Sequence, residues 1–335
     1  MRWSAAEFVT RWWAGQLGSA GAFLDVVAAP LEWAYRGAVA ARNTAYEHGL
    51  LEAHAVGVPV ISVGNLSVGG SGKTPVSGWL ISELQRRGRR PALLHGAYAP
   101  DEPELHRRWA PGVPVLENRD RLAAAARAVA EGADVLVLDD AFQHRRIARD
   151  LDLLLVACES WGRRIRLLPR GGWREPPGSA RRASLIAVTR RRAPAELAER
   201  AAAELARLAP GVRVIRLHLR PAGWRHQGDA APPPGQPALA VAAVADPGSF
   251  LDNARSAGAV LHDQRWWRDH HRYHAADAAL ILARAGTAPI VTTEKDWVKL
   301  ERLLPADRVW VLRQEVAVES GHAELAAALE RVLQR

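Results

Sequence analysis

Short apolar runs alternate with longer segments of helical periodicity along most of the chain. The runs are rich in β-branched residues and leucine and predict buried strands. They lie at residues 60–63, 91–94, 134–140, 151–156, 184–189, 238–242, 288–293 and 309–312. Apolar residues at helical spacing predict helices, which are expected at residues 75–87, 119–131, 194–208, 247–257 and 322–333. This alternation predicts an α/β fold with a parallel sheet covered by helices on both faces.

Two other stretches interrupt this pattern and suggest how the chain is divided. Residues 95–114 lack a clear period and are expected to be irregular, whereas residues 228–237 hold four prolines and two glycines. Such a composition is typical of a connection between domains, and a length of 335 residues also suggests about two domains. The expected division is a helical segment at 1–50, a larger domain at 51–227 and a smaller α/β domain at 228–335.

A glycine-rich loop follows the first predicted strand and carries the clearest chemical signal. The loop consists of Gly69, Gly70, Ser71 and Gly72. Lys73 and Thr74 come next, and Pro75 suits the start of a helix. This is the order of a phosphate-binding P-loop, in which backbone N–H groups and the lysine hold phosphates and the threonine hydroxyl holds Mg²⁺. The alternative is an ordinary glycine turn, because Ser67 stands where the strict motif has glycine.

Acidic residues elsewhere in the chain could complete a phosphoryl-transfer site. Asp139 and Asp140 end a hydrophobic strand, where P-loop enzymes keep the acid that holds Mg²⁺. Acids also terminate strands without any such role. Asp101 is a candidate base for an attacking hydroxyl. The segment at residues 266–272 is a second candidate, because a histidine there could pair with a carboxylate to orient it and tune its pKa.

Charge and cysteine content narrow the classes of partner. The net charge is +9 and arginine far outnumbers lysine, which favours polyanionic partners such as anionic lipid or phosphorylated substrates. The same excess of arginine could simply solvate the surface. No nucleic-acid-binding motif is found, and the single cysteine, Cys158, excludes a disulfide framework. A reducing cytoplasm agrees with this composition.

The first 36 residues combine tryptophan, phenylalanine and arginine in an amphipathic pattern. Their longest uncharged stretch, residues 12–24, is too short to span a bilayer. The pattern suits a helix lying at a membrane interface. A helix packed against the protein's own core would explain the same residues.

Several motifs in their joint order resemble those of the tetraacyldisaccharide 4'-kinases. The motifs lie at residues 29–31, 42–49, 58–75, 101–103, 139–144, 167–169, 174–176, 269–271 and 293–296. The resemblance covers nearly the whole chain. It implies a kinase of a lipid A precursor, acting at the cytoplasmic face of the Gram-negative inner membrane with two α/β domains and an N-terminal helix that docks on the membrane.

The resemblance also implies roles for individual residues. It implies that the P-loop binds ATP, that Lys73 assists catalysis, and that Thr74, Asp139 and Asp140 serve Mg²⁺. It implies that Asp101 and His270 form the base dyad. Further residues would line the substrate site: Glu102, Gln143, His144, Arg174 and Glu175. The expected partners are the lipid disaccharide and the inner-membrane surface, with no nucleic acid, and the expected state is a peripheral monomer.

The chain departs from the family pattern in front of the proposed base. The segment between residues 95 and 103 is shortened, and Pro100 replaces the usual glycine. This change leaves two alternatives to an active lipid kinase: an ATP-binding protein that has lost catalysis, or a P-loop kinase of another acceptor. The last alternative expects the N-terminal aromatic residues to be buried.

Overall fold

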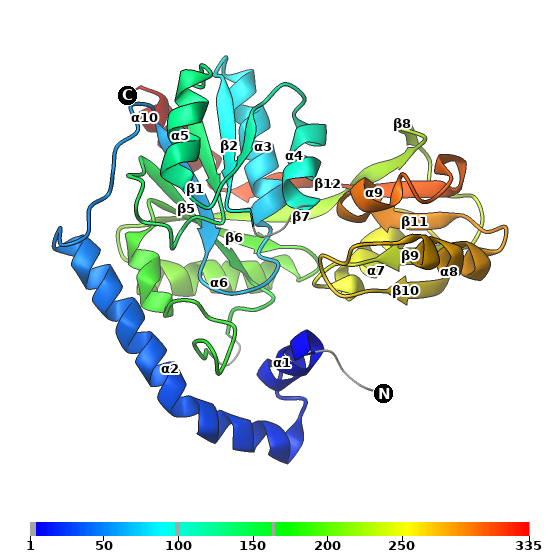
Figure 1. The fold of residues 1–335 in the computed structure, drawn as a ribbon, viewed down its shortest axis with the longest axis horizontal. Coiled ribbons are helices and arrows are strands. Elements are labelled where there is room, and N and C mark those ends of the chain that lie inside the picture. The colour runs from blue at the N-terminus through cyan, green and yellow to red at the C-terminus, as the bar shows by residue number, and fades with distance from the viewer. Residues whose placement is uncertain (1–4, 98–100, 163–164, 335) are drawn as a thin grey trace.

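The computed structural model describes residues 5–97, 101–162 and 165–334, and its central feature is one continuous sheet of 12 strands (Figure 1). The sheet runs in the order β10-β9-β11-β12-β7-β6-β5-β1-β4-β2-β3, and β8 pairs with β7. The strands are β1 Val60–Asn65, β2 Pro91–His95, β3 Val115–Glu117, β4 Val135–Asp139, β5 Leu151–Ala157, β6 Leu185–Arg190, β7 Arg213–His226, β8 Asp229–Ala231, β9 Ala238–Ala242, β10 Leu261–Trp266, β11 Ile290–Thr293 and β12 Val309–Ser320.

Ten α-helices occur within the described residues. They are α1 Ala5–Trp13, α2 Gly18–Glu47, α3 Lys73–Arg86, α4 Asp101–Trp109, α5 Arg121–Ala130, α6 Ala195–Leu208, α7 Pro247–Ser256, α8 Ala275–Ala285, α9 Glu294–Leu300 and α10 His322–Leu333. The predicted α/β class is confirmed, and so is the parallel pairing of the P-loop strands.

Successive residues of the central strands face opposite sides of the sheet, which is why both sides need a helical cover. On β5, Leu153 belongs to a core shared with α3 and α10, and Leu154 belongs to a core shared with α6. A third cluster buries α5 against β2 and β4. The hydrophobic runs of the sequence therefore reflect strands that are buried on both faces.

The chain forms two α/β halves joined by a long antiparallel ladder. The P-loop half contains β1 to β6, and the second half contains β9, β10 and β11 with helices α7, α8 and α9 (Figure 1). Strands β7 and β12 pair from Arg216 to His226 and extend along both halves. The proline-rich segment 228–237 is thus only one of two connections, since β12 leads the chain back.

The expected division at residue 228 needs a correction at its C-terminal end. Helix α10 lies against the P-loop half, where Leu325, Leu329 and Val332 are buried among residues such as Leu84. The apolar stripe of this helix completes the core on one face of the P-loop sheet, so residues 321–334 pack away from the second half. The remaining boundaries stay a prediction.

The irregular stretch expected at 95–114 is also wrong in part. It contains α4, whose first turn carries Asp101, Glu102 and Glu104. Acidic residues in the first turn favour a helix through its dipole, and Pro103 is tolerated there because the first N–H groups need no intrahelical partner. Residues 98–100, the altered stretch before Asp101, lie outside the described residues.

The N-terminal helices extend along one side of the P-loop half (Figure 1). Helix α2 is 30 residues long and is held by its polar side chains: Asn43 Nδ2 donates to Glu175 at 2.9 Å, and Glu32 accepts from the Leu167 N–H at 3.0 Å. Its apolar residues, by contrast, are largely exposed. They include Phe23, Val26, Val27, Leu31 and Trp33, with between 56% and 71% of each residue accessible.

Candidate active site

The phosphate-binding loop lies between β1 and α3, as the sequence predicts. Gly72 has a φ of +88°, and a Cβ there would come within 2.3 Å of Leu219, so only glycine fits. Two hydrogen bonds hold Ser71 in place. Its hydroxyl accepts from Asn65 Nδ2 at 2.9 Å, and its carbonyl accepts from the Thr189 hydroxyl at 2.9 Å. Helix α3 begins at Lys73, so its N-terminus is directed toward any anion bound in the loop.

Two carboxylates follow β4 and lie beside the loop. Strand β4 pairs with β1 so that Asp139 is opposite Val63. The Lys73 ammonium is 3.7 Å from Asp140 Oδ1, and the Ser77 hydroxyl donates to Asp139 Oδ1 at 3.0 Å. Asp140 has a φ of +47°, an uncommon conformation that strains the backbone at the end of the strand.

Burial and neighbouring histidines set the ionisation of Asp139. Burial alone would raise its pKa, but the adjacent His106 and the charges of His95 and Lys73 lower the pKa below its usual range. Its Oδ2 is buried, has no hydrogen-bond partner among the described residues, and lies 3.5 Å from His106 Nε2. An ionised carboxylate with a spare oxygen beside a P-loop suits a hard cation such as Mg²⁺.

Two of the expected substrate residues, Arg174 and Gln143, lie next to Asp140. Arg174 Nη1 donates to Asp140 Oδ1 at 2.7 Å and to Gln143 Oε1 at 3.4 Å. Gln143 in turn donates to the Asn65 carbonyl at 2.9 Å. Arg174 thus brings a second cation to the phosphate end of the site, in addition to Lys73.

The proposed base is assembled from both halves of the molecule. Asp101 lies at the start of α4, and His270 lies in the loop after β10; His270 Nδ1 is 2.7 Å from Asp101 Oδ1. Burial would raise the pKa of Asp101, but the hydrogen bond with His270 and the charge of Lys295 lower it well below its usual range. The hydrogen bond with Asp101 raises the pKa of His270, although burial and Lys295 oppose this effect.

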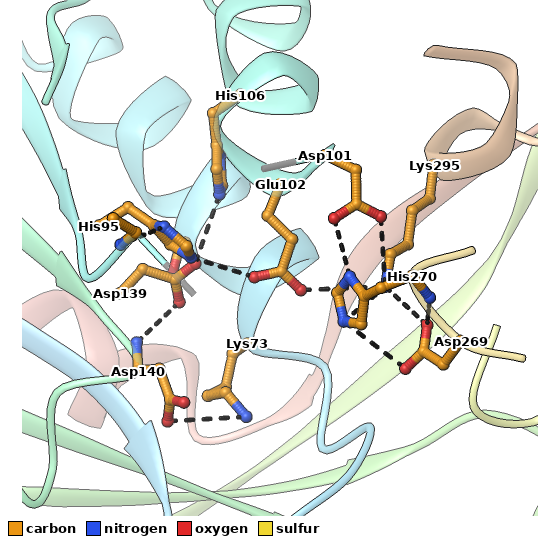
Figure 2. Close-up of polar contacts among 12 residues, drawn as sticks. Lys73, His95, Asp101, Glu102, His106, Asp139, Asp140, Asp269, His270 and Lys295 are labelled. Carbon is orange, nitrogen blue, oxygen red and sulfur yellow. Dashed lines mark hydrogen bonds and ion pairs between the residues drawn. The ribbon is translucent and has the colours of Figure 1, made fainter. Parts of the chain in front are cut away.

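Figure 2 shows how the phosphate end connects with the base. Glu102 lies between them: its Oε2 is 3.2 Å from His95 Nε2, and its Oε1 is 4.0 Å from Lys295. One ligand atom from each of His95, Glu102 and Asp139 lies within 4.8 Å of the others. His95 and Glu102 pair with each other, whereas Asp139 keeps a spare oxygen, so the Asp139–Asp140 pair is the better candidate for holding a cation. A pocket opens beside Asp101 and His270, toward Arg272 and Lys299.

The structure places the other two expected substrate residues differently. Glu175 is fully buried and accepts from Arg42, Asn43 and Arg182, so both of its oxygens hold α2 and the following loop in place. The buried Nε2 of His144 has no hydrogen-bond partner among the described residues. Burial and the charge of Arg121 lower the pKa of His144 to about 4, which keeps it neutral. Neither side chain joins the groups around Asp101 and Asp140.

Sequence reasoning missed several residues that build the site. Arg121 is almost completely buried and donates to the carbonyls of Asp139 and Asp140, at 2.8 and 3.3 Å, which supports the strained turn. His95 and His106 lie against Glu102 and Asp139. An arginine or histidine gives no contiguous motif, and only its burial in the fold distinguishes it from the many on the surface.

Comparisons with known proteins agree on one family. The family described as tetraacyldisaccharide-1-P 4'-kinase matches residues 24–334. A tetraacyldisaccharide 4'-kinase of Anaeromyxobacter dehalogenans is 37% identical over 354 residues, which cover 95% of this chain and 93% of the relative. One from Halorhodospira halophila is 36% identical, covering 92% of each chain. The crystal structure of the "apo" form of LpxK from Aquifex aeolicus in complex with ATP superposes with a TM-score of 0.73 at 26% identity, covering 92% of this chain and 99% of that chain.

Proposed function

Because the chain belongs to the tetraacyldisaccharide-1-phosphate 4'-kinase family, we propose that it transfers the γ-phosphoryl group of ATP to the 4'-hydroxyl of a tetraacyldisaccharide 1-phosphate lipid. The observation that carries this proposal is the row of closely spaced polar groups that leads from Lys73 through Asp139 and Glu102 toward His270. It joins a P-loop to a carboxylate base through Glu102 (Figure 2). No comparison supports the two alternatives, an inactive ATP-binding protein or a kinase of another acceptor.

The residues at the phosphate end bind and neutralise the nucleotide. The loop at residues 69–72 would surround the phosphates, and Lys73 and Arg174, which both lie beside Asp140, would place positive charge next to them. Thr74, Asp139 and Asp140 would hold Mg²⁺, which when bound neutralises charge on the phosphate oxygens. Asp139 meets this requirement because it is ionised and keeps one oxygen free of hydrogen bonds within the described residues.

Asp101 then acts on the acceptor. Its carboxylate accepts the proton of the sugar hydroxyl while the hydroxyl oxygen attacks the γ-phosphorus and ADP leaves. His270 holds this carboxylate from one side, at 2.7 Å. Because Asp101 is ionised throughout the ordinary pH range, its basicity depends on whether the neighbouring imidazole is neutral or charged.

The exposed apolar face of α2 supports docking on a membrane. Phe23, Leu31 and Trp33 are at least 60% accessible, which disfavours a helix buried in the protein's own core. No helix among the described residues has both the length and the apolar character needed to span a bilayer. An interfacial helix and a net charge of +9 suit peripheral binding to an anionic surface, here the cytoplasmic face of the inner membrane.

The first experiment measures transfer of radiolabelled γ-phosphate from ATP to the purified disaccharide 1-phosphate lipid in detergent micelles, with and without Mg²⁺. We expect a magnesium-dependent labelled product, and none with Lys73→Ala, because removing one group that stabilises transition-state charge lowers rates about 100- to 1,000-fold. An absence of product from a protein that still binds ATP would refute the proposed activity.

Membrane docking is tested separately with anionic phospholipid vesicles. The double variant Phe23→Ser, Trp33→Ser should sediment with the vesicles less than the wild type does, because it removes two exposed apolar anchors. The matched control is Leu280→Ser, which alters an exposed leucine of α8 in the second half. Equal sedimentation of all three proteins would exclude docking through α2.

A further inference from the structure

The second half contributes two lysines to the proposed base, and the composition of the chain makes them conspicuous. Of the 45 lysines and arginines, only three are lysines: Lys73, Lys295 and Lys299. Lys73 is in the P-loop, and the other two approach Asp101 from α9, at 3.9 and 3.4 Å from its Oδ2. A chain that uses arginine almost everywhere else therefore keeps its ammonium groups at the candidate active site.

Lys295 occupies a position that a planar guanidinium would not fill. Its Nζ is 2.9 Å from Asp269 Oδ1, 3.2 Å from His270 Nε2 and 4.0 Å from Glu102 Oε1 (Figure 2). A compact ammonium has three rotatable donors and can serve groups that lie in several directions, whereas arginine presents a flat fork. Burial lowers the pKa of Lys295, but Asp269, Asp101 and Glu102 raise it, so the group stays charged.

These contacts determine which ring nitrogen of a neutral His270 carries the proton. An ammonium can only donate, so Nε2 must accept from Lys295. The Asp101 carboxylate can only accept, so Nδ1 must carry the proton directed at it. An imidazolium would bring an Nε2–H against the ammonium at 3.2 Å, which is repulsive.

We infer that Lys295 is a positioning residue that fixes His270 as the neutral tautomer with its proton on Nδ1. This inference rests on the proposed role of Asp101 as the base. A neutral imidazole hydrogen-bonds the carboxylate without adding a full positive charge beside it, so Asp101 keeps more of its affinity for the proton of the acceptor hydroxyl. The segment containing Lys295 thereby takes part in catalysis without contacting the transferred phosphoryl group.

Other charged groups around His270 influence its titration. Asp101 and Glu102 approach from α4, Lys295 and Lys299 from α9, and Asp269 from the same loop, with its Oδ2 3.7 Å from Nε2. The three carboxylates favour the imidazolium and the two lysines oppose it. Among these groups only Lys295 donates to Nε2, so its removal would allow Nε2 to take up a proton directed toward Asp269.

The test is ¹⁵N NMR of the histidine side chains in the full-length protein, with the His270 signals identified by their loss in His270→Gln. At pH 7.5 the wild type should show a neutral imidazole protonated at Nδ1. Lys295→Met keeps the length of the side chain but removes its charge and donors, and should raise the His270 midpoint by about one pH unit. Its transfer rate should fall about tenfold at neutral pH and recover as the pH rises above that midpoint.

Lys299→Met is the matched control, because Lys299 pairs with Asp101 at 3.4 Å, whereas the ammonium beside His270 Nε2 is that of Lys295. It should leave the proton on Nδ1 and shift the midpoint less than Lys295→Met does. A wild-type imidazole protonated at Nε2, or an unchanged spectrum in Lys295→Met, would overturn the inference. The wild-type spectrum decides the tautomer even if the variant does not fold. Failure of the transfer assay would refute the proposed function but leave the tautomer result standing.

Discussion

The phosphate end and the base end of the site are built in different ways. The phosphate end comes from one contiguous strand, loop and helix, supported by the neighbouring strand β4 in the same half. The base end joins Asp101 to His270, 169 residues away in the chain and in the other half. The comparison shows that nucleotide binding depends on local structure, whereas base strength depends on how the two halves meet. Variants that separate the two functions can test this difference.

The largest expected effect is at the base end. Asp101→Asn removes the proton acceptor, so the transfer rate should fall about 100- to 10,000-fold while the affinity for ATP is unchanged. Initial rates at saturating ATP, together with a nucleotide-binding titration, measure both quantities. Asp252→Asn, an exposed aspartate of α7, serves as the matched control and should keep the wild-type rate. Weakened ATP binding in Asp101→Asn would show that the two ends are not independent.

A moderate effect is expected where the halves meet. Arg108 of α4 forms a two-pronged ion pair with Glu301, with Nη1 donating to Oε2 at 2.6 Å. Both side chains are about 30% exposed, so solvent weakens the pair and its loss should cost about 1 kcal/mol.

Glu301→Gln should therefore lower the transfer rate about fivefold without changing ATP affinity, because α4 and α9 carry the base and its lysines. Steady-state kinetics with each substrate varied will show this. Glu315→Gln is the control, since it breaks an exposed pair with Arg220 in the β7–β12 ladder. An equal loss in both variants would mean that the α4–α9 contact has no special importance.

The smallest effect concerns stability rather than activity. The pKa of His144 is lowered from 6.5 to about 4, so between these values the unfolded chain binds a proton that the folded protein does not. Stability should therefore decrease as the pH falls from about 6.5 to about 4. In His144→Gln the free energy of unfolding should change less steeply with pH over this range, by at most the equivalent of one bound proton. Urea unfolding at several pH values measures this slope. His262→Gln, at an exposed site on β10, should keep the wild-type slope.

Sequence reasoning succeeded where a feature depends on neighbouring residues. The P-loop and the acidic end of β4 could be recognised because strand, loop and helix signals follow one another along the chain. Helix α4 was missed because residues 95–114 lack a clear apolar period, and the Pro103 in its first turn is compatible with a helix. The Asp101–His270 contact was expected only through a family resemblance, since no local pattern indicates which distant side chains meet.

The residues that tune the site were harder to predict for the same reason. Arg121 is one of many arginines, and only the fold shows that it is buried beneath the Asp139–Asp140 turn. Glu175 was expected to bind substrate, but its partners on α2 can be identified only after the N-terminal helix is placed. Pairing between segments far apart in the chain is a tertiary property, and a single sequence does not encode it in local periodicity.

The return of α10 to the P-loop half has a consequence for synthesis of the protein on the ribosome. Leu325, Leu329 and Val332 are made after the whole second half, yet they belong to the core that contains Leu84 and residues of β1. Until residue 332 leaves the exit tunnel, α3 alone cannot complete this core, so part of one face of the nascent P-loop sheet lacks its cover although its strands were made long before. During that interval the unfinished sheet needs protection from aggregation, so the P-loop half completes its core only after the second half and α10 have been made.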